Sequence, residues 1–296
     1  MTTGDIQILR VTQARQVEAL KILFSRFPID QQAARVEDTL LAERGGVSVG
    51  GALVMHQPDD VALVWPPVIQ DRADERRIGG ALMTAVCRDL DDSRARFAQC
   101  LLSPEEADEA GWLLEFGFSS AAKLYFLARS LEEIPAVEPG LDEFETFVEP
   151  GNVERFAALI EQTYEGSLDC PMLNGRRSGA DALASHRLSG QFDPRGWRLY
   201  QSGGRDVAVL LLNEHPDQDA VELVYFGVAP DYRGRGFGRR VLGEALALAR
   251  SWKRAAMFLA VDAGNAFANQ IYSAWGFQEV AQRNVWLRFP GNSAQQ

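Results

Sequence analysis

The sequence predicts an α/β protein with mixed sheets, in which one fold occurs twice in tandem. A run of strand-forming residues, 221–228, passes through a glycine-rich turn directly into an apolar-periodic helix. A similar order of elements occurs in the first half of the chain. The length of 296 residues accommodates two domains of about 150 residues each. We therefore expect a domain at residues 1–135 and a second at residues 136–296.

The first half is predicted to alternate strands and helices, with a Pro-Asp-Asp turn between two long strands. In chain order we expect a strand at 6–11, an amphipathic helix to Phe27, strands at 47–56 and 61–69, a helix opening at 76–82, a strand at 97–102, and a helix before Phe116.

The second half follows a segment rich in Pro and Glu, which is typical of an inter-domain linker. In chain order we expect this linker at 132–140, a strand at 144–148, a helix from its cap Asn152 to about Thr163, the strand 221–228, a helix after the glycine turn, a strand at 256–261, a short helix ending near Tyr272, and a disordered tail at 291–296.

Two landmarks support the repeat. The glycine turns at Gly79 and Gly236 lie 157 residues apart, and the Gly-Phe pairs at Gly117 and Gly276 lie 159 apart. The first copy is degenerate, because a leucine stands four residues before Gly117 where the second copy has Tyr272. The turn at Arg76 either still holds a phosphate ligand or is a plain helix start.

The turn at residues 233–240 carries four arginines and three glycines. A helix N-terminus offers unpaired N–H groups and positive potential, which suits a phosphate. A P-loop would need Lys-Ser/Thr after the glycines, and none follows. A dinucleotide fold would need a longer βαβ series than the remaining residues allow. A solvated arginine face is the simpler alternative.

Further residues resemble the GNAT superfamily of N-acyltransferases. Arg233, Gly236 and Gly238 fill its Arg/Gln-x-x-Gly-x-Gly/Ala motif, which binds the diphosphate of coenzyme A. A later set of positions matches the family's second motif: Asn265, Ala268, Ile271, Tyr272, Gly276 and Phe277. The tandem arrangement is similar to that of the mycothiol synthases, among other two-copy members. The resemblance implies two GNAT-like domains and acetyl-CoA as co-substrate.

The same resemblance implies roles for individual residues. Glu222 is the candidate general base, and Tyr272 the candidate general acid for the departing thiolate. Tyr164 and Asp169 are expected near the acceptor amine. The cofactor-binding residues are expected to be Phe226, Gly227, Val228, Arg233, Gly234, Arg235, Gly236, Phe237, Gly238, Arg239 and Asn265.

Each of these assignments has a structural alternative. The alternative for Glu222 is a solvent-facing glutamate at a strand edge, and the alternative for Tyr272 is a packed aromatic ring on a short helix. Asn265 could merely cap a helix, and Asp169 a turn before Pro171. Gly227 is expected to allow close approach of the pantetheine arm to the strand.

The charge and the cysteine content of the chain disfavour several classes of function. The net charge of −11 disfavours nucleic-acid binding, which needs a basic surface. The three cysteines suggest neither a disulfide framework nor a zinc site, so we expect no metal and a cytoplasmic protein. We see neither a signal peptide nor a membrane-spanning run. The leading hypothesis is acetyl transfer from acetyl-CoA to a small primary amine. The alternatives are a non-catalytic acyl-CoA sensor and, disfavoured by the charge, aminoacyl transfer from tRNA.

Overall fold

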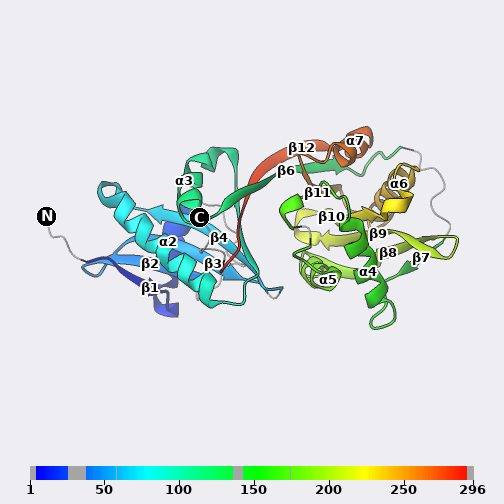
Figure 1. Ribbon diagram of the computed structural model, residues 1–296. Coiled ribbons are helices and arrows are strands. Elements are labelled where there is room, and N and C mark those ends of the chain that lie inside the picture. The colour runs from blue at the N-terminus through cyan, green and yellow to red at the C-terminus, as the bar shows by residue number, and fades with distance from the viewer. Residues whose placement is uncertain (1–4, 26–37, 58, 136–142, 174, 292–296) are drawn as a thin grey trace. The chain divides into compact units, whose positions relative to one another are not determined.

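A computed structural model describes residues 5–25, 38–57, 59–135, 143–173 and 175–291 (Figure 1). The chain divides into two compact units, which we call unit 1 (Met1–Ala121 with Asn284–Gln296) and unit 2 (Ala122–Arg283). Both units therefore combine residues from the two sides of the boundary expected at 135/136. Phe27, most of the expected linker and nearly all of the expected tail lie outside the described residues.

Unit 1 contains a mixed sheet. Its first four strands pair antiparallel in chain order, β5 joins β4 in parallel, and the end of β12 pairs antiparallel with β5. The elements are β1 Gln7–Arg10, α1 Gln16–Phe24, β2 Thr39–Arg44, β3 Val47–His56, β4 Val61–Ile69, α2 Glu75–Asp92, β5 Phe97–Leu102, α3 Ala110–Glu115 and β12 Gln278–Arg288.

Helices cover both faces of this sheet because successive strand residues point to opposite sides. Leu40 and Ala42 share a core cluster with residues of α2, such as Leu82. Leu41, between them, packs instead with Leu23 of α1. The alternating apolar residues of β2 thus fix which helix lies on which face.

Unit 2 repeats this plan. Its strands follow the order β6-β11-β10-β9-β8-β7, and only β10 and β11 pair in parallel. The elements are β6 Ser119–Ser130, β7 Phe144–Thr146, α4 Val153–Tyr164, α5 Gly179–His186, β8 Gln191–Ser202, β9 Arg205–His215, β10 Ala220–Val228, α6 Phe237–Ser251, β11 Ala256–Asp262 and α7 Ala266–Ala274.

The two faces of the unit 2 sheet are again separated by strand alternation. Leu210 and Leu212 pack in one cluster with residues of α6. Leu211 packs in another, with Phe156 of α4. Figure 1 shows α4, in green, and α6, in yellow, beside the strands that they cover. The α/β class predicted from the sequence is confirmed.

Each unit completes its sheet with a strand from the other half of the sequence. In unit 2, residues 124–130 of β6 pair with β11. In unit 1, residues 284–288 of β12 pair with β5, and buried Arg288 donates two hydrogen bonds of 2.9 Å to Asp91. Hydrophobic periodicity is the same whichever sheet a strand joins. It therefore could not predict that the two halves exchange these strands.

The start of α4 differs from the expected cap. Asn152 occupies the N-cap position, but its side chain makes no capping bond to the helix. Its Oδ1 accepts from the Val148 N–H at 2.8 Å and its Nδ2 donates to the Thr146 carbonyl at 2.9 Å. The residue therefore holds the turn that leads into the helix.

Candidate active site

The site of unit 2 arises where two parallel strands separate. β10 and β11 pair only from Ala220/Ala256 to Glu222/Phe258. Beyond this point β10 remains paired with β9, and β11 with β6. A register shift on β10 between Leu223 and Tyr225 marks the divergence. The separation leaves the far end of β10 open toward β11.

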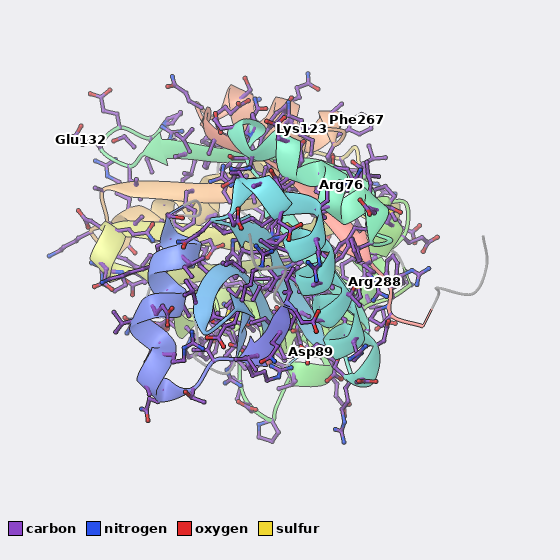
Figure 2. All side chains as sticks on the ribbon, turned by 90° about the vertical axis from the view of Figure 1, so that its left-hand side faces the viewer. Arg76, Asp89, Lys123, Glu132, Phe267 and Arg288 are labelled. Atoms are coloured by element: carbon purple, nitrogen blue, oxygen red, sulfur yellow. The ribbon has the colours of Figure 1, made fainter. Side chains whose placement is uncertain are left out.

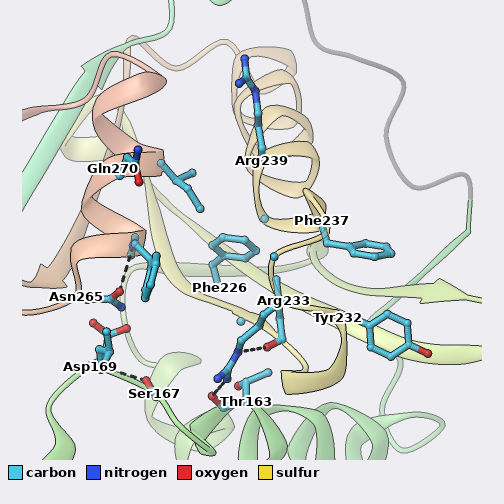
Figure 3. Close-up of a pocket in the computed structure, with 18 of the residues that line it drawn as sticks. Thr163, Ser167, Asp169, Phe226, Tyr232, Arg233, Phe237, Arg239, Asn265 and Gln270 are labelled. Carbon is cyan, nitrogen blue, oxygen red and sulfur yellow. Dashed lines mark hydrogen bonds between the residues drawn. The ribbon is translucent and has the colours of Figure 1, made fainter.

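A cavity of about 740 Å³ lies at this opening, a size typical of small-molecule sites. Figure 3 shows it between the N-terminal ends of α6 and α7 and the loop that follows α4. The lining residues are Thr163, Gly166, Ser167, Leu168, Asp169, Tyr225, Phe226, Gly227, Val228, Tyr232, Arg233, Gly234, Gly236, Phe237, Gly238, Arg239, Asn265, Phe267, Ala268, Gln270, Ile271 and Tyr272.

The glycine turn forms an open loop at the start of α6, and this loop is the candidate anion-binding loop. Gly234 and Gly236 have φ of +73° and +82°, a region that favours glycine, and a Cβ at either would meet no atom within 4 Å. The N-cap residue Gly236 makes no side-chain cap, and no acidic residue stands in the first turn. The start of α6 thus has neither a capping side chain nor an acidic residue beside its first N–H groups, an arrangement that could hold an anion such as a diphosphate.

Arg233 serves a different contact from the one expected. Its guanidinium donates to the backbone carbonyls of Thr163 (2.8 Å), Glu165 (2.7 Å) and Val228 (3.1 Å) (Figure 3). Two of these carbonyls belong to the C-terminal end of α4, where a cation is favourable. Arg233 therefore ties the end of α4 to the anion-binding loop.

The other loop arginines differ in orientation. Arg239 lines the cavity and extends along α6 in Figure 3. Arg235 does not line it, and its guanidinium lies 5.4 Å from the Tyr232 ring centroid. Arg240 lies over Phe237 at 4.7 Å. Of the arginines that follow Arg233, only Arg239 is among the lining residues.

Gly227 is needed for helix packing. A Cβ at Gly227 would lie 2.7 Å from Oγ1 and 2.9 Å from Cβ of Thr163, which is buried. Thr163 in turn donates to the Ile160 carbonyl and shares a 2.6 Å hydrogen bond with the Tyr225 hydroxyl. The missing side chain at Gly227 therefore allows α4 to approach the strand closely, and Gly227 also lines the cavity.

Asp169 lies on the loop after α4 and is held at the end of β11. Its Oδ1 accepts from the Asp262 N–H at 3.2 Å, and the Cys170 N–H donates to Asp262 Oδ2 at 2.9 Å. Burial raises the pKa of the Asp169 carboxyl, while its hydrogen bond with Asn265 lowers it. The residue is nevertheless exposed, and it lines the cavity. Asn265 also caps α7, accepting from the Ala268 N–H at 3.1 Å.

Two tyrosines face the same cavity. Tyr272 of α7 is 7% exposed, and burial, then Asp169 and Tyr225, raise the pKa of its hydroxyl. Burial also raises the pKa of Tyr225. Both phenols therefore remain protonated at neutral pH and can donate hydrogen bonds. Tyr225 was missed in the sequence because its neighbours on the strand are equally aromatic and apolar.

Glu222 and Tyr164 do not line the cavity. Glu222 occupies the last paired position before the strands diverge. Its carboxylate accepts from Ser189 Oγ at 2.5 Å and lies 2.8 Å from His215 Nε2. Tyr164 packs its ring edge-on against Tyr225, with centroids 6.2 Å apart.

The corresponding region of unit 1 lacks the anion-binding loop. Helix α2 begins at Glu75, so Gly79 lies inside the helix, and a Cβ there would meet the Trp112 ring at 2.4 Å. Arg76, labelled in Figure 2, is 86% exposed and pairs with Glu115 at 3.2 Å. These contacts favour the plain helix start.

Both candidate catalytic residues of unit 2 have leucine at the matching positions of unit 1. In the matching parallel register, Leu63 is the third paired residue, as Glu222 is in unit 2. Leu113 stands where unit 2 has Tyr272, and it is fully buried.

The described residues contain neither a metal-binding cluster of side chains nor a membrane-spanning helix. No group of three or more His, Cys, Asp or Glu side chains in the described ranges could hold a metal ion. No helix in this part of the chain combines the length and apolarity needed to cross a membrane.

Residues 161–277 match the model of the Acetyltransferase (GNAT) family. A mycothiol acetyltransferase of Thermobispora bispora is 27% identical over 91% of this chain and 94% of its own. The N-alpha-acetyltransferase RimI of Mycobacterium tuberculosis is 40% identical over 25% of this chain and 44% of its own. A tandem GNAT protein from the clavulanic acid biosynthesis pathway shares the fold, with a TM-score of 0.57 at 14% identity, covering 98% of this chain and 100% of its own.

Proposed function

Because the chain is a tandem protein of the GNAT acetyltransferase family and an acyl-CoA-dependent N-acetyltransferase, we propose that the cavity of unit 2 transfers an acetyl group from acetyl-CoA to a small primary amine. The observation that supports this most is the open glycine loop at the N-terminus of α6, beside the separated strands. In this proposal the loop residues 234–239 hold the diphosphate, and Phe226–Val228 hold the pantetheine arm.

The proposal requires three groups around the reacting atoms. The amine nitrogen attacks the thioester carbonyl, a C–N bond forms, and the C–S bond breaks. The nitrogen must lose one proton and the departing sulfur gains one, so the site needs an acceptor and a donor. A developing oxyanion needs an N–H donor, which the exposed end of β10 can supply.

We assign the proton acceptor to Glu222, acting through a water molecule. Its place where the strands separate supports this, since the cavity opens just beyond it. His215 and Ser189 hold the carboxylate in place. Unit 1, which has Leu63 at the matching position, lacks this group.

We assign the proton donor to Tyr272, whose side chain lines the cavity. The raised pKa of its hydroxyl keeps the proton on the phenol at neutral pH. A free thiol has a pKa of about 8.5, which is lower than that of the phenol. The phenol therefore stabilises the departing thiolate by a hydrogen bond before the sulfur gains its proton.

The experiment is a screen of primary amines with acetyl-CoA, following thiol release. Glu222→Gln should lose ~10²–10⁴-fold in turnover on an amine that the wild type acetylates, with unchanged acetyl-CoA affinity. Tyr272→Phe should lower turnover in the same way. A Glu222→Gln enzyme with wild-type turnover would reject the assigned base, and the absence of thiol release with every amine would reject the proposed reaction.

A further inference from the structure

We propose that the acceptor is a monocationic amine that carries an apolar substituent and no acidic group, such as an alkyl- or aralkylamine. This inference depends on the acetyl transfer proposed above. It follows from the distribution of charge and of exposed apolar surface around the cavity.

The charged side chains along the cavity are unevenly placed. Asp169 is the one acidic residue among those that line it, and the cations are Arg233 and Arg239. In Figure 3, Asp169 lies beside Asn265 and Ser167, whereas Arg239 extends along α6 on the other side of Phe226. Asp169 thus marks a negative end of the cavity and Arg239 a positive end, while the guanidinium of Arg233 lies beside Thr163 and is bonded to backbone carbonyls.

The positive end is already matched to a ligand group. Arg239 stands in the first turn of α6, beside the loop that fits a diphosphate. Arg233 directs its guanidinium to three backbone carbonyls. Neither cation is therefore placed to neutralise an acidic group on an acceptor that lies beside Asp169.

The negative end suits an ammonium group. Asp169 is exposed and is held in position by the Asp262 N–H. An amine docked there as an ammonium ion would gain a charge-assisted hydrogen bond, and it would release one proton to water before the neutral nitrogen attacks the thioester. A carboxylate or phosphate on the same acceptor would instead lie near a like charge.

Two exposed apolar side chains line the same cavity as this carboxylate. Leu168, the neighbour of Asp169 in the chain, is 41% exposed and lines the cavity. Phe267 also lines it and is 74% exposed, the highest value among the exposed large hydrophobic residues of the described chain. It lies on α7 two residues after Asn265, the partner of Asp169, and Figure 2 shows it at the surface. An apolar substituent on the amine would remove this surface from water.

The test compares three acceptors with acetyl-CoA: 2-phenylethylamine, L-phenylalanine and ethanolamine. The first two differ by a carboxylate, and the third lacks the apolar group. We expect kcat/KM for 2-phenylethylamine to exceed both others by ~10-fold or more. Equal or higher kcat/KM for L-phenylalanine or ethanolamine would overturn the proposal.

Single-residue variants test which side chains produce this preference among the amines. Phe267→Ala should raise KM for 2-phenylethylamine by ~10-fold and leave acetyl-CoA affinity unchanged, because the ring contacts the acceptor. Val280→Ala is the control, since Val280 is 66% exposed and does not line the cavity. Asp169→Asn should reduce the preference for 2-phenylethylamine over L-phenylalanine. If Phe267→Ala binds acetyl-CoA more weakly and its KM for the amine is unchanged, the ring contacts the co-substrate and not the acceptor. That result would refute this acceptor site.

The same assays distinguish a wrong acceptor class from a wrong reaction. If ethanolamine is acetylated and the aralkylamine is not, the acceptor class is wrong and acetyl transfer stands. If acetyl-CoA binds but no thiol is released with any amine, the reaction itself is wrong.

Discussion

Gly227→Ala tests whether the position of α4 depends on the absence of a side chain on β10. The new Cβ would lie 2.7–2.9 Å from three atoms of Thr163, closer than real contacts allow. Thr163 cannot turn aside cheaply, because it is buried and its hydroxyl bonds both Ile160 and Tyr225. We expect α4 to be displaced from the strand, at a cost of about 1–3 kcal/mol.

Urea denaturation measures this cost. Gly238→Ala is the matched control in the same cavity, since its Cβ would make only ordinary contacts of 3.4–3.5 Å with Ile271 and Phe226. Its helical position favours alanine, so stability should hold or rise by up to ~1 kcal/mol. In a Thr163→Gly background, which removes all three contacted atoms, the effect of Gly227→Ala should shrink, with a coupling of about 0.5–3 kcal/mol. Unchanged stability of Gly227→Ala, or additive effects in the double variant, would refute the reasoning.

Three further predictions concern charge, pH and packing. Arg239→Gln should weaken acetyl-CoA binding and make the affinity less dependent on salt concentration. Arg233→Gln should weaken binding but leave the salt dependence unchanged. Titrations of acetyl-CoA at several salt concentrations distinguish the two variants. Burial, and after it the charge of Arg177, lowers the pKa of His186 from 6.5 to about 3. Between these two pH values His186 binds a proton in the unfolded chain but not in the native state. Stability should therefore be complete above pH ~6.5 and fall toward pH 3 by up to ~1.4 kcal/mol per pH unit, and denaturation of His186→Phe should show a shallower decline. Gly179→Ala should destabilise strongly, because its Cβ would lie 1.9 Å from a backbone carbonyl of α4, while Gly80→Ala, with open space, should not; thermal unfolding compares them.

Local features of the site could be predicted from the sequence. Gly234 and Gly236 stand between a strand and a helix, and the positive φ that they adopt follows from that turn alone. Long β strands such as Val47–His56 and Phe97–Leu102 have the predicted bounds, because alternation and turn residues define them locally.

Features that depend on distant residues could not be predicted. Two of the three carbonyl partners of Arg233 lie 68 and 70 residues earlier in the chain, which no motif spacing indicates. The bonds of Glu222 to Ser189 and His215 likewise depend on the packing of a loop against the sheet. The same holds for the exchange of β6 and β12, since pairing partners are set by the whole sheet.

The central claim is that the loop before α6 binds the diphosphate of acetyl-CoA, and only in unit 2. Calorimetric titration of acetyl-CoA into the wild-type chain and into Gly236→Asp tests it most directly, because the new side chain would place a carboxylate at φ +82° beside the diphosphate. The account predicts one acetyl-CoA per wild-type chain and an affinity at least ~10-fold lower in the variant. Two bound molecules per chain, or equal affinity in the variant, would contradict it.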